Sequence, residues 1–418
     1  MLDFSNLIAS DCFAQRARHP DFPNAFTRDR KLPLPALIAT LLSMRAGSQQ
    51  TLLDTFFTNL CAGIGMGAGL VRGVSDRAFA KARSHLHMPA LSWLNDWVLG
   101  RAEAAAVVPR WHGLRLVAAD ASVLMPAIRA SHRSRSPAAA DQRLFALYLP
   151  GAELTLHASV HSADTSERAM LMQALDKLGP DDVLLLDRGY PAAWLVSLLC
   201  ARGVRFVMRC DKERTGWSAV GQFVRSGAGQ AVVRLNAPSA QDADDWGCAT
   251  SAPEVRLVRH VSSNARVRVL ATNLDDVDFP CECFGEIYHK RWRIEEAFKR
   301  LKHRYQLEAV SGLSQQALIV DVAAKVLADN LASLMCATAL AQRPDSTEPL
   351  RRQCNRSYAA QAMLRMLPSV LMFVGDVLAT IHDTLDLLRR TTNRIVPGRS
   401  SPRPDHHVKP HARYAYKG

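Results

Sequence analysis

Residues 182–190 read Asp182-Val-Leu-Leu-Leu-Asp187-Arg-Gly-Tyr190, an apolar run that ends in a carboxylate followed by a glycine. A short apolar run bounded by turn residues is typical of a strand that is buried on both faces of a sheet. A second such run, from Leu114 to Ala119, also ends in a carboxylate, Asp120. If the two strands are neighbours, both carboxylates lie at one edge of the sheet.

The segments around these two runs complete a mixed α/β pattern. Pro150 and Gly151 lie between two β-prone stretches and suit a hairpin turn. The expected order is three strands, a helix, a strand, a helix and a strand, at residues 114–119, 144–149, 154–160, 166–178, 182–186, 192–202 and 205–209. That order predicts a mixed sheet with helices packed on it.

The chain on either side of this core follows other patterns. Residues 1–110 carry apolar residues at helical spacing, and Ser75 is placed to cap a helix that presents Arg77 and Lys81 on one face. Between residues 211 and 265, short β-prone pieces are separated by Gly, Ser, Ala and Asp, which predicts a β-rich insertion. We expect a helical N-terminal domain (1–110), an α/β domain with the insertion (111–310) and a helical C-terminal region (311–418) that ends in a basic tail.

The chain is basic, with 52 Lys and Arg against 39 Asp and Glu and a net charge of +13. This excess favours a polyanionic partner, nucleic acid before a membrane. The nine cysteines include no Cys-x-x-Cys pair, so the pattern of a structural zinc site is missing. The first residues lack the features of a signal peptide, and the most apolar later stretch, 366–375, is about half of the ~20 residues that span a bilayer. We expect a soluble cytoplasmic protein with no membrane partner.

A basic segment that starts near residue 284 predicts a long helix with two distinct faces. One stripe is apolar and is expected to pack on the sheet: Ile287, Ile294, Phe298 and Leu301. The other stripe offers a carboxylate flanked by cations and a phenol: Tyr288, Arg291, Glu295 and Lys302. An Arg and a Glu four residues apart are also a common surface ion pair. The helix alone therefore does not decide the function.

Three carboxylates, Asp120, Asp187 and Glu295, are candidate metal ligands. Two neighbouring carboxylates repel each other unless a cation lies between them. Mg²⁺ and Mn²⁺ prefer hard oxygen ligands of this kind. An Asp that follows a strand is also a common turn or cap residue, so the interpretation rests on all three together.

Taken together, these residues resemble the transposases of bacterial insertion sequences, in the cut-and-paste branch marked by a Tyr-x2-Arg-x3-Glu-x6-Lys signature. Here the signature runs through four residues with every spacing met: Tyr288, Arg291, Glu295 and Lys302.

The resemblance extends beyond this helix. The second Asp of the family lies in Asp-x-Gly-Tyr/Phe, which matches residues 187–190. The first Asp, usually followed by Gly, corresponds to Asp120, which Ala follows here. Residues 26–37 and the sequence Thr272-Asn273-Leu274 also look like this branch.

The resemblance implies a ribonuclease-H-like catalytic domain that is interrupted by a β-rich insertion, with the helical N-terminal domain binding DNA. It implies that two Mg²⁺ or Mn²⁺ ions are held by Asp120, Asp187 and Glu295. It assigns contacts with DNA phosphates to three residues of the helix: Tyr288, Arg291 and Lys302. It also implies an aromatic residue in the insertion that stacks on a flipped base, for which Trp217 and Trp246 are candidates.

Such an enzyme cuts and rejoins the ends of an insertion sequence. Water attacks the phosphodiester at the element end, the released 3′-hydroxyl attacks the opposite strand to give a hairpin, and the reopened end attacks target DNA. The expected partners are double-stranded DNA of the terminal repeats and of the target. Because two ends must be joined, we expect a homodimer on DNA, associated with the bacterial nucleoid when bound.

Two alternative functions remain open at this point. The first is a ribonuclease-H-like DNA nuclease that cuts without strand transfer. The second is a non-catalytic DNA-binding inhibitor of transposition, against which the presence of all three carboxylates argues.

Overall fold

The computed structural model describes residues 1–28, 31–63, 73–128, 140–210, 217–261, 267–342 and 352–396, together with positions 132 and 134. The chain forms two units, and each is built from segments far apart in the sequence. Unit 1 contains residues 1–107, 124–141 and 299–418, and unit 2 contains residues 108–123 and 142–298. The basic tail expected at residues 389–418 lies outside the described residues from position 397 onward.

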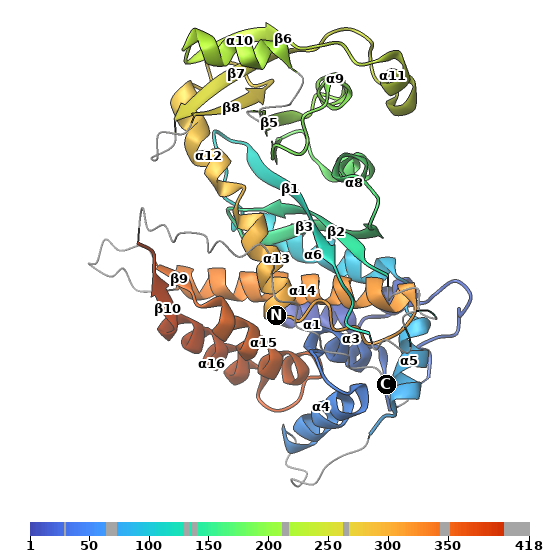
Figure 1. The fold of residues 1–418 in the computed structure, drawn as a ribbon. Coiled ribbons are helices and arrows are strands. Elements are labelled where there is room, and N and C mark those ends of the chain that lie inside the picture. Colours follow the sequence, from blue (N-terminus) through green and yellow to red (C-terminus); the bar gives the residue numbers. More distant parts are fainter. Residues whose placement is uncertain are drawn as a thin grey trace. The chain divides into compact units, whose positions relative to one another are not determined.

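Unit 2 is built on an eight-stranded mixed sheet with the order β3-β2-β1-β4-β5-β8-β7-β6 (Figure 1). The strands are β1 (Arg115–Leu124), β2 (Gln142–Leu149), β3 (Leu154–Ser162), β4 (Asp182–Leu186), β5 (Arg205–Arg209), β6 (Gln230–Arg234), β7 (Glu254–Val261) and β8 (Val267–Thr272). β4 pairs in parallel with both β1 and β5. β2 pairs antiparallel with β3, and β8 pairs antiparallel with β5 and β7.

The central strand β4 is buried at all five positions, as expected for a parallel strand covered on both faces. Two longer helices follow the first strands, α8 (Glu167–Ala174) and α9 (Ala193–Ala201). α8 packs against β2, α9 against β5, and α12 (Phe284–Lys290) against β7. Figure 1 shows α12 on the opposite side of the sheet from α8 and α9. The predicted order of three strands, helix, strand, helix and strand is confirmed.

The described part of the insertion, residues 217–261, does not form a separate module, because its two strands extend the main sheet. β6 pairs with β7, and β7 with β8. Two helices were not predicted here, α10 (Ser218–Ser226) and α11 (Ala240–Trp246). Each ends at a glycine in the left-handed region, Gly227 and Gly247, a conformation that costs glycine little. Both helices are short and lie in a stretch rich in polar residues, so the sequence did not indicate them.

The Thr272-Asn273-Leu274 motif holds the β5 and β8 strands together at one end. Asn273 accepts a hydrogen bond from the backbone N–H of Phe206 at 3.0 Å and donates one to the carbonyl of Val204 at 2.9 Å. The hydroxyl of Thr272 donates to the carbonyl of Phe206 at 2.6 Å. The motif therefore has a structural explanation that does not involve a ligand.

Unit 1 contains the helices from both ends of the chain. From the N-terminal part come α1 (Leu2–Ile8), α2 (Asp11–Ala17), α3 (Leu34–Ser43), α4 (Gln49–Gly63), α5 (Asp76–Ser84) and α6 (Pro89–Ala104). From the C-terminal part come α14 (Gln315–Ala341), α15 (Arg356–Leu371), α16 (Val377–Arg390) and a small ribbon of β9 (Arg352–Cys354) and β10 (Thr392–Arg394). The predicted cap of α5 is confirmed, since Ser75 accepts from the N–H of Ala78.

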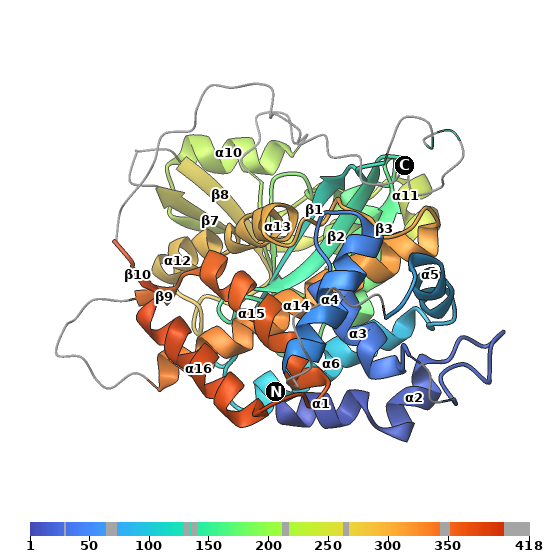
Figure 2. The same ribbon diagram turned by 90° about the horizontal axis from the view of Figure 1, so that it is seen from below.

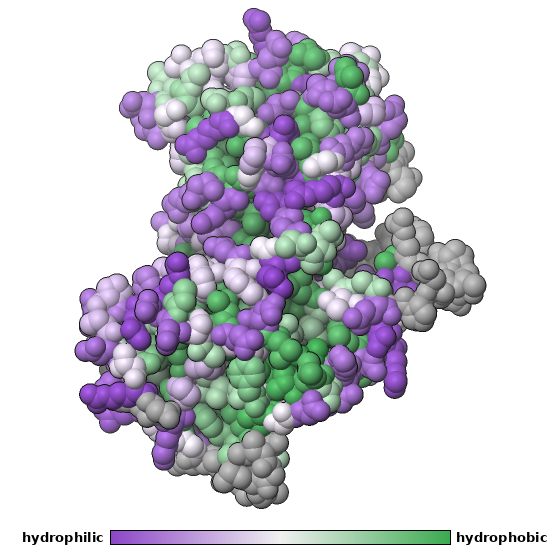
Figure 3. Space-filling model, turned by 180° about the vertical axis from the view of Figure 1, so that it is seen from behind, coloured by the Kyte–Doolittle hydropathy of each residue, from purple (hydrophilic) through white to green (hydrophobic). Residues whose placement is uncertain are grey.

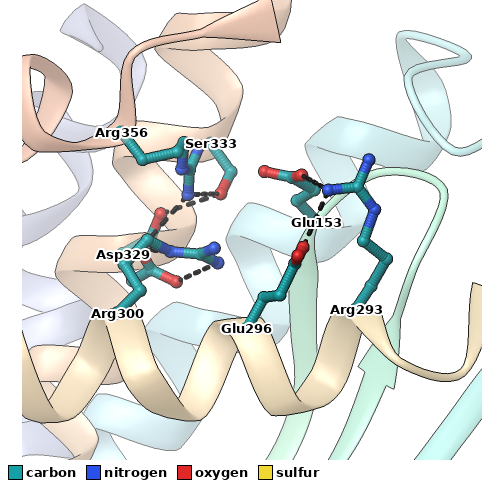
Figure 4. A network of polar contacts seen from close by, with 7 residues as sticks. All are labelled: Glu153, Arg293, Glu296, Arg300, Asp329, Ser333 and Arg356. Atoms are coloured by element: carbon teal, nitrogen blue, oxygen red, sulfur yellow. Dashed lines mark hydrogen bonds and ion pairs between the residues drawn. The ribbon is translucent and has the colours of Figure 1, made fainter. Parts of the chain in front are cut away.

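The long helix α14 forms the centre of unit 1. α3, α6, α15 and α16 pack against it (Figure 2). Its charged residue Asp329 is 1% exposed and accepts two hydrogen bonds from Arg300, at 2.7 and 2.8 Å. Arg356 completes the network by donating to Asp329 at 3.2 Å and to Ser333 at 2.6 Å (Figure 4). Buried charges are tolerated in a core when they are paired and hydrogen-bonded in this way.

On the face drawn in Figure 3, polar and charged residues cover much of the surface, and a broad apolar area is exposed among them. Among the described residues, no helix combines the length and the apolar character needed to cross a membrane. The predicted mixed α/β fold with helical N- and C-terminal regions is confirmed, and its sheet has eight strands.

Candidate active site

Asp120 and Asp187 lie at equivalent positions on neighbouring strands. β1 and β4 are parallel, and their register pairs Ala118 with Leu185. Each Asp lies two residues beyond that pair, so the expectation that the two strands are neighbours is confirmed. The expectation that Asp120 ends its strand is wrong, because β1 continues to Leu124. The pairing of β1 with β4 does stop at Ala118, since β4 itself ends at Leu186 and the chain turns away.

The turn after β4 explains the Asp-x-Gly-Tyr sequence. The carboxylate of Asp187 accepts a hydrogen bond from the N–H of Gly189 at 2.7 Å, which closes a local Asp turn. Arg168, at the start of α8, donates to the carbonyls of Gly189, Tyr190 and Pro191, each at 3.0 Å. The position of Asp187 is therefore fixed by both its own turn and a neighbouring helix.

Gly189 also allows a close approach of two carboxylates. A Cβ atom at this position would lie 3.0 Å from Oδ1 of Asp187 and 3.3 Å from Oε2 of Glu167. Any larger residue would press on both side chains. The glycine therefore leaves room for two acidic groups on either side of it.

Arg291 joins the first and the third candidate carboxylates. Its Nη1 lies 3.4 Å from Oδ2 of Asp120, and its Nη2 donates to Oε1 of Glu295 at 2.9 Å. The Arg291 side chain is only 6% exposed, against 16% for Asp120 and 29% for Glu295. Glu295 is thus brought to the same end of the sheet as Asp120 through a buried cation. The three candidate carboxylates all belong to unit 2.

The pKa values of two carboxyl groups at this site, Asp120 and Glu167, are raised. Burial raises the pKa of Asp120 to about 7, opposed by Arg291 and reinforced by Asp187 and Glu167. Burial also raises the pKa of Glu167, with a further rise from Asp187. Two nearby carboxylates raise each other's pKa because ionising both costs energy in a poorly solvated site. A divalent cation would remove that cost.

Glu167 is a residue of the site that sequence reasoning missed. It is the first residue of α8, next to the capping Ser166, and an acidic residue there is common because it interacts favourably with the helix dipole. Nothing in its sequence neighbourhood distinguishes it from such an ordinary helix start. Only the fold places it beside Asp187 across Gly189.

Arg291 and Tyr190 each have a buried polar atom without a partner in the described part of the chain. These atoms are Nε of Arg291 and the hydroxyl of Tyr190. Tyr190 is 0% exposed, and Glu167, Asp120 and Asp187 are the acidic groups that act on it. Buried polar groups without partners are rare in native proteins and call for an explanation such as an absent ligand.

The predicted long helix is in fact two helices, α12 and α13 (Arg293–His303), which meet at Arg291 and Trp292. The helix is interrupted because the backbone N–H groups of Arg291 and Trp292 bond three residues back, to Tyr288 and His289. The apolar stripe is confirmed: Ile287, Ile294, Phe298 and Leu301 are all buried.

The polar stripe is less exposed than its sequence suggests. Tyr288 is 2% exposed and Arg291 is 5% exposed. Burial raises the pKa of Tyr288 to about 12, although Arg291 and Arg209 lower it. Lys302 falls in unit 1, where its Nζ lies 3.5 Å from Oε1 of Glu308.

α13 also carries a second set of ion pairs within unit 2. Arg293 lies 2.8 Å from Glu296 and 3.5 Å from Glu153 (Figure 4). The Arg293 side chain is 39% exposed, so these contacts are surface ion pairs of small energetic value. They contrast with the buried cation at Arg291, only two residues earlier.

The two candidate base-stacking residues are engaged within the protein. Trp217 is 7% exposed and precedes α10. Trp246 stacks on Trp194, with ring centroids 4.2 Å apart and an angle of 4° between the planes. Trp217 is therefore buried, and one face of the Trp246 ring is covered by Trp194.

The oxygen atoms of the three candidate carboxylates are of the chemical kind that binds a divalent cation. No group of three His, Cys, Asp or Glu side chains within the described ranges is already arranged around one point. Arg291 accounts for this arrangement, because it compensates the charges of Asp120 and Glu295 without a metal. Carboxylate oxygens at one sheet end, with an unpaired hydroxyl among them, are nevertheless the hard donors that Mg²⁺ and Mn²⁺ take.

Comparison with known proteins bears on this site. A structure of the piggyBac transposase, solved by cryo-electron microscopy as a synaptic complex with hairpin DNA, is similar at a TM-score of 0.42 and 12% identity, over 96% of this chain and 86% of that chain. No curated protein matches the sequence. The family model described as the transposase DDE domain matches residues 122–331, which is half of the chain and includes Asp187 and Glu295. The chain therefore belongs to the family of transposase DDE domains, enzymes that cut DNA with the help of divalent metal ions.

Proposed function

We propose that the protein is the transposase of a bacterial insertion sequence, of the cut-and-paste branch with the Tyr-Arg-Glu-Lys signature, and that Asp120, Asp187 and Glu295 are its catalytic carboxylates. One observation carries this proposal. Asp120 and Asp187 lie at the same level beyond a parallel strand pair, and Arg291 joins Asp120 to Glu295. Residues far apart in the sequence are thus gathered at one end of one sheet.

The three carboxylates would hold two Mg²⁺ or Mn²⁺ ions. When bound, these ions supply the Lewis-acid chemistry that favours attack of a hydroxyl group on a phosphodiester. The turn of Asp187 and the hydrogen bonds of Arg168 hold one ligand in place before any ion arrives. No covalent intermediate between protein and DNA is required, so no nucleophilic side chain is assigned.

Arg291 is suited to bind a DNA phosphate next to these carboxylates. Its buried Nε has no partner among the described residues, and a guanidinium recognises phosphate through several N–H groups. We also assign a DNA phosphate contact to Lys302, through its charge. Tyr288 is buried, so we propose that it reaches DNA only after a rearrangement or acts through Arg291.

The remaining parts of the chain would serve DNA binding and assembly. Arg77 and Lys81 are exposed on one face of α5, which supports a DNA-binding role for residues 1–110. Residues 111–310 would form the catalytic domain, and residues 311–418 the helical C-terminal region with its basic tail. Because two ends of an element must be joined, we propose a homodimer that binds terminal repeats and target DNA.

The experiment is a cleavage assay on labelled DNA that flanks the gene, with Mg²⁺ and with nick, hairpin and double-strand break resolved over time. A transposase of this branch yields all three products in that order. A nuclease without strand transfer yields breaks without hairpins, and a non-catalytic inhibitor binds the DNA and yields none of them.

The same assay tests Arg291, between α12 and α13, and Lys302 of α13. Because only the hairpin step needs a strained DNA end, Arg291→Ala and Lys302→Ala should accumulate nicked DNA at the expense of hairpins. Arg293→Ala is the matched control, since its side chain is exposed and paired with Glu296. Unchanged product ratios in Arg291→Ala and Lys302→Ala would remove both residues from the proposed phosphate contacts.

A further inference from the structure

We propose that Glu167 is a fourth carboxylate ligand of the divalent cations at this site, placed next to Asp187 by the start of α8. The inference rests on the proposed function, because it adds a ligand to the metal site proposed there. It concerns a residue that lies outside the Asp-Asp-Glu set.

The geometry brings Glu167 and Asp187 together on either side of Gly189. Oε2 of Glu167 and Oδ1 of Asp187 are the two oxygens that a Cβ atom on Gly189 would meet, at 3.3 and 3.0 Å. Arg168 fixes this arrangement, because its guanidinium binds the carbonyls of Gly189, Tyr190 and Pro191. The start of α8 is therefore tied to the turn that carries Asp187.

A second observation points to a ligand among these groups. The hydroxyl of Tyr190 is buried and has no hydrogen-bond partner in the described part of the chain. The acidic groups that act on it are Glu167, Asp120 and Asp187, in that order of influence. A cation bound by these carboxylates would draw them together, and one of their oxygens could then accept a hydrogen bond from the Tyr190 hydroxyl.

The negative charge of Glu167 is only weakly compensated by its ion pair, so a cation could still bind it. Glu167 forms an ion pair with Arg143 at 3.7 Å, and the two side chains are 30% and 33% exposed, respectively. Such a long and partly solvated pair contributes little. The simpler explanation of Glu167 is a helix-start acid paired with Arg143, and the experiment must separate this from metal ligation.

The test is the binding of Mn²⁺ to the full-length protein without DNA, measured by calorimetry and by the loss of the free-ion signal in electron paramagnetic resonance. Four variants are compared with the wild type: Glu167→Gln, Asp187→Asn, Arg143→Gln and Glu153→Gln. Arg143→Gln removes the ion pair with Glu167 but keeps the Glu167 carboxylate. Glu153→Gln removes a carboxylate of the same unit that pairs with Arg293 instead.

We expect Glu167→Gln and Asp187→Asn each to weaken Mn²⁺ binding by at least about 10-fold, because even the loss of a residue that only holds a ligand in place weakens metal binding by roughly 10- to 100-fold. Arg143→Gln and Glu153→Gln should bind like the wild type. Normal binding by Glu167→Gln together with weak binding by Asp187→Asn overturns this inference and leaves the proposed function intact. Normal binding by Asp187→Asn overturns the metal site itself. Equal losses in Glu167→Gln and Arg143→Gln show that the ion pair matters rather than a ligand, which also overturns the inference.

Discussion

Replacing Arg291 by Gln should destabilise the metal-free protein and leave the metal-loaded protein much less affected. The guanidinium is buried and bridges Asp120 at 3.4 Å and Glu295 at 2.9 Å. Burial lowers the pKa of Arg291, but its interactions with Tyr288, Asp120 and Asp187 outweigh burial and the net shift is upward. The cation is therefore stabilised where it lies, and its loss leaves Asp120 buried without compensation.

The size of the effect follows from the contacts. A charge-assisted hydrogen bond such as that of Arg291 to Glu295 contributes about 1.5–3 kcal/mol. Breaking a buried ion pair by removing one partner costs about 3–5 kcal/mol. Because Glu295 is partly solvated and the contact to Asp120 is long, we expect about 3 kcal/mol, the lower end of that range. With saturating Mn²⁺ the loss should fall to about 1 kcal/mol, since the ions replace the missing cation.

The assay is urea unfolding followed by tryptophan fluorescence, in EDTA and in Mn²⁺. Arg293→Gln is the matched control, because its surface ion pairs should contribute under about 1 kcal/mol. The reasoning would be refuted if Arg291→Gln lost no more free energy of unfolding than Arg293→Gln does. It would also be refuted if Arg291→Gln lost the same free energy of unfolding in EDTA and in Mn²⁺.

Three further predictions concern other parts of the structure. Asp329→Ala should lower the free energy of unfolding by about 3–5 kcal/mol in urea, because it removes the buried carboxylate that binds Arg300 and Arg356. The exposed Asp3→Ala should cost under about 1 kcal/mol, and similar losses in both variants would contradict the account of the core. Tyr190→Phe should raise the stability of the metal-free protein by about 1 kcal/mol, because an unsatisfied buried hydroxyl is removed, and this gain should vanish in Mn²⁺; a loss of stability in EDTA would show that the hydroxyl already has a partner. Asp120 has a pKa of about 7 in the folded protein against 3.8 in a model peptide, so its contribution to stability should fall as pH rises from 3.8 to about 7 and stay constant above; Asp120→Asn should abolish this component of the pH profile, and identical profiles for variant and wild type would rule it out.

The sheet and the paired Asp residues could be predicted from the sequence because local patterns determine them. A buried run such as residues 183–186 is predicted as a strand from its own residues, and Asp187 follows the end of that strand. The hairpin, the alternation of strands and helices, and the cap at Ser75 depend on similarly local signals. These parts of the prediction needed no knowledge of distant contacts.

The parts that escaped prediction depend on tertiary contacts. Nothing near Glu167 in the sequence reveals that Gly189 will bring it beside Asp187. The interruption at Arg291 and Trp292 breaks a stripe that a continuous helix would have kept in line. The burial of Tyr288 is a further example, since its position on the polar stripe indicated exposure.

The central claim is that Asp120, Asp187 and Glu295 act in DNA cleavage rather than in DNA binding. The most direct measurement is a parallel binding and cleavage assay on labelled element-end DNA with Asp120→Asn, Asp187→Asn and Glu295→Gln. These changes keep the size of each side chain and remove its charge. The account predicts that every variant binds the DNA about as tightly as the wild type, since binding depends mainly on Lys and Arg contacts with phosphate, and that none of them cuts it in Mg²⁺. Substantial cleavage by any one of the three would contradict the account and remove that residue from the site.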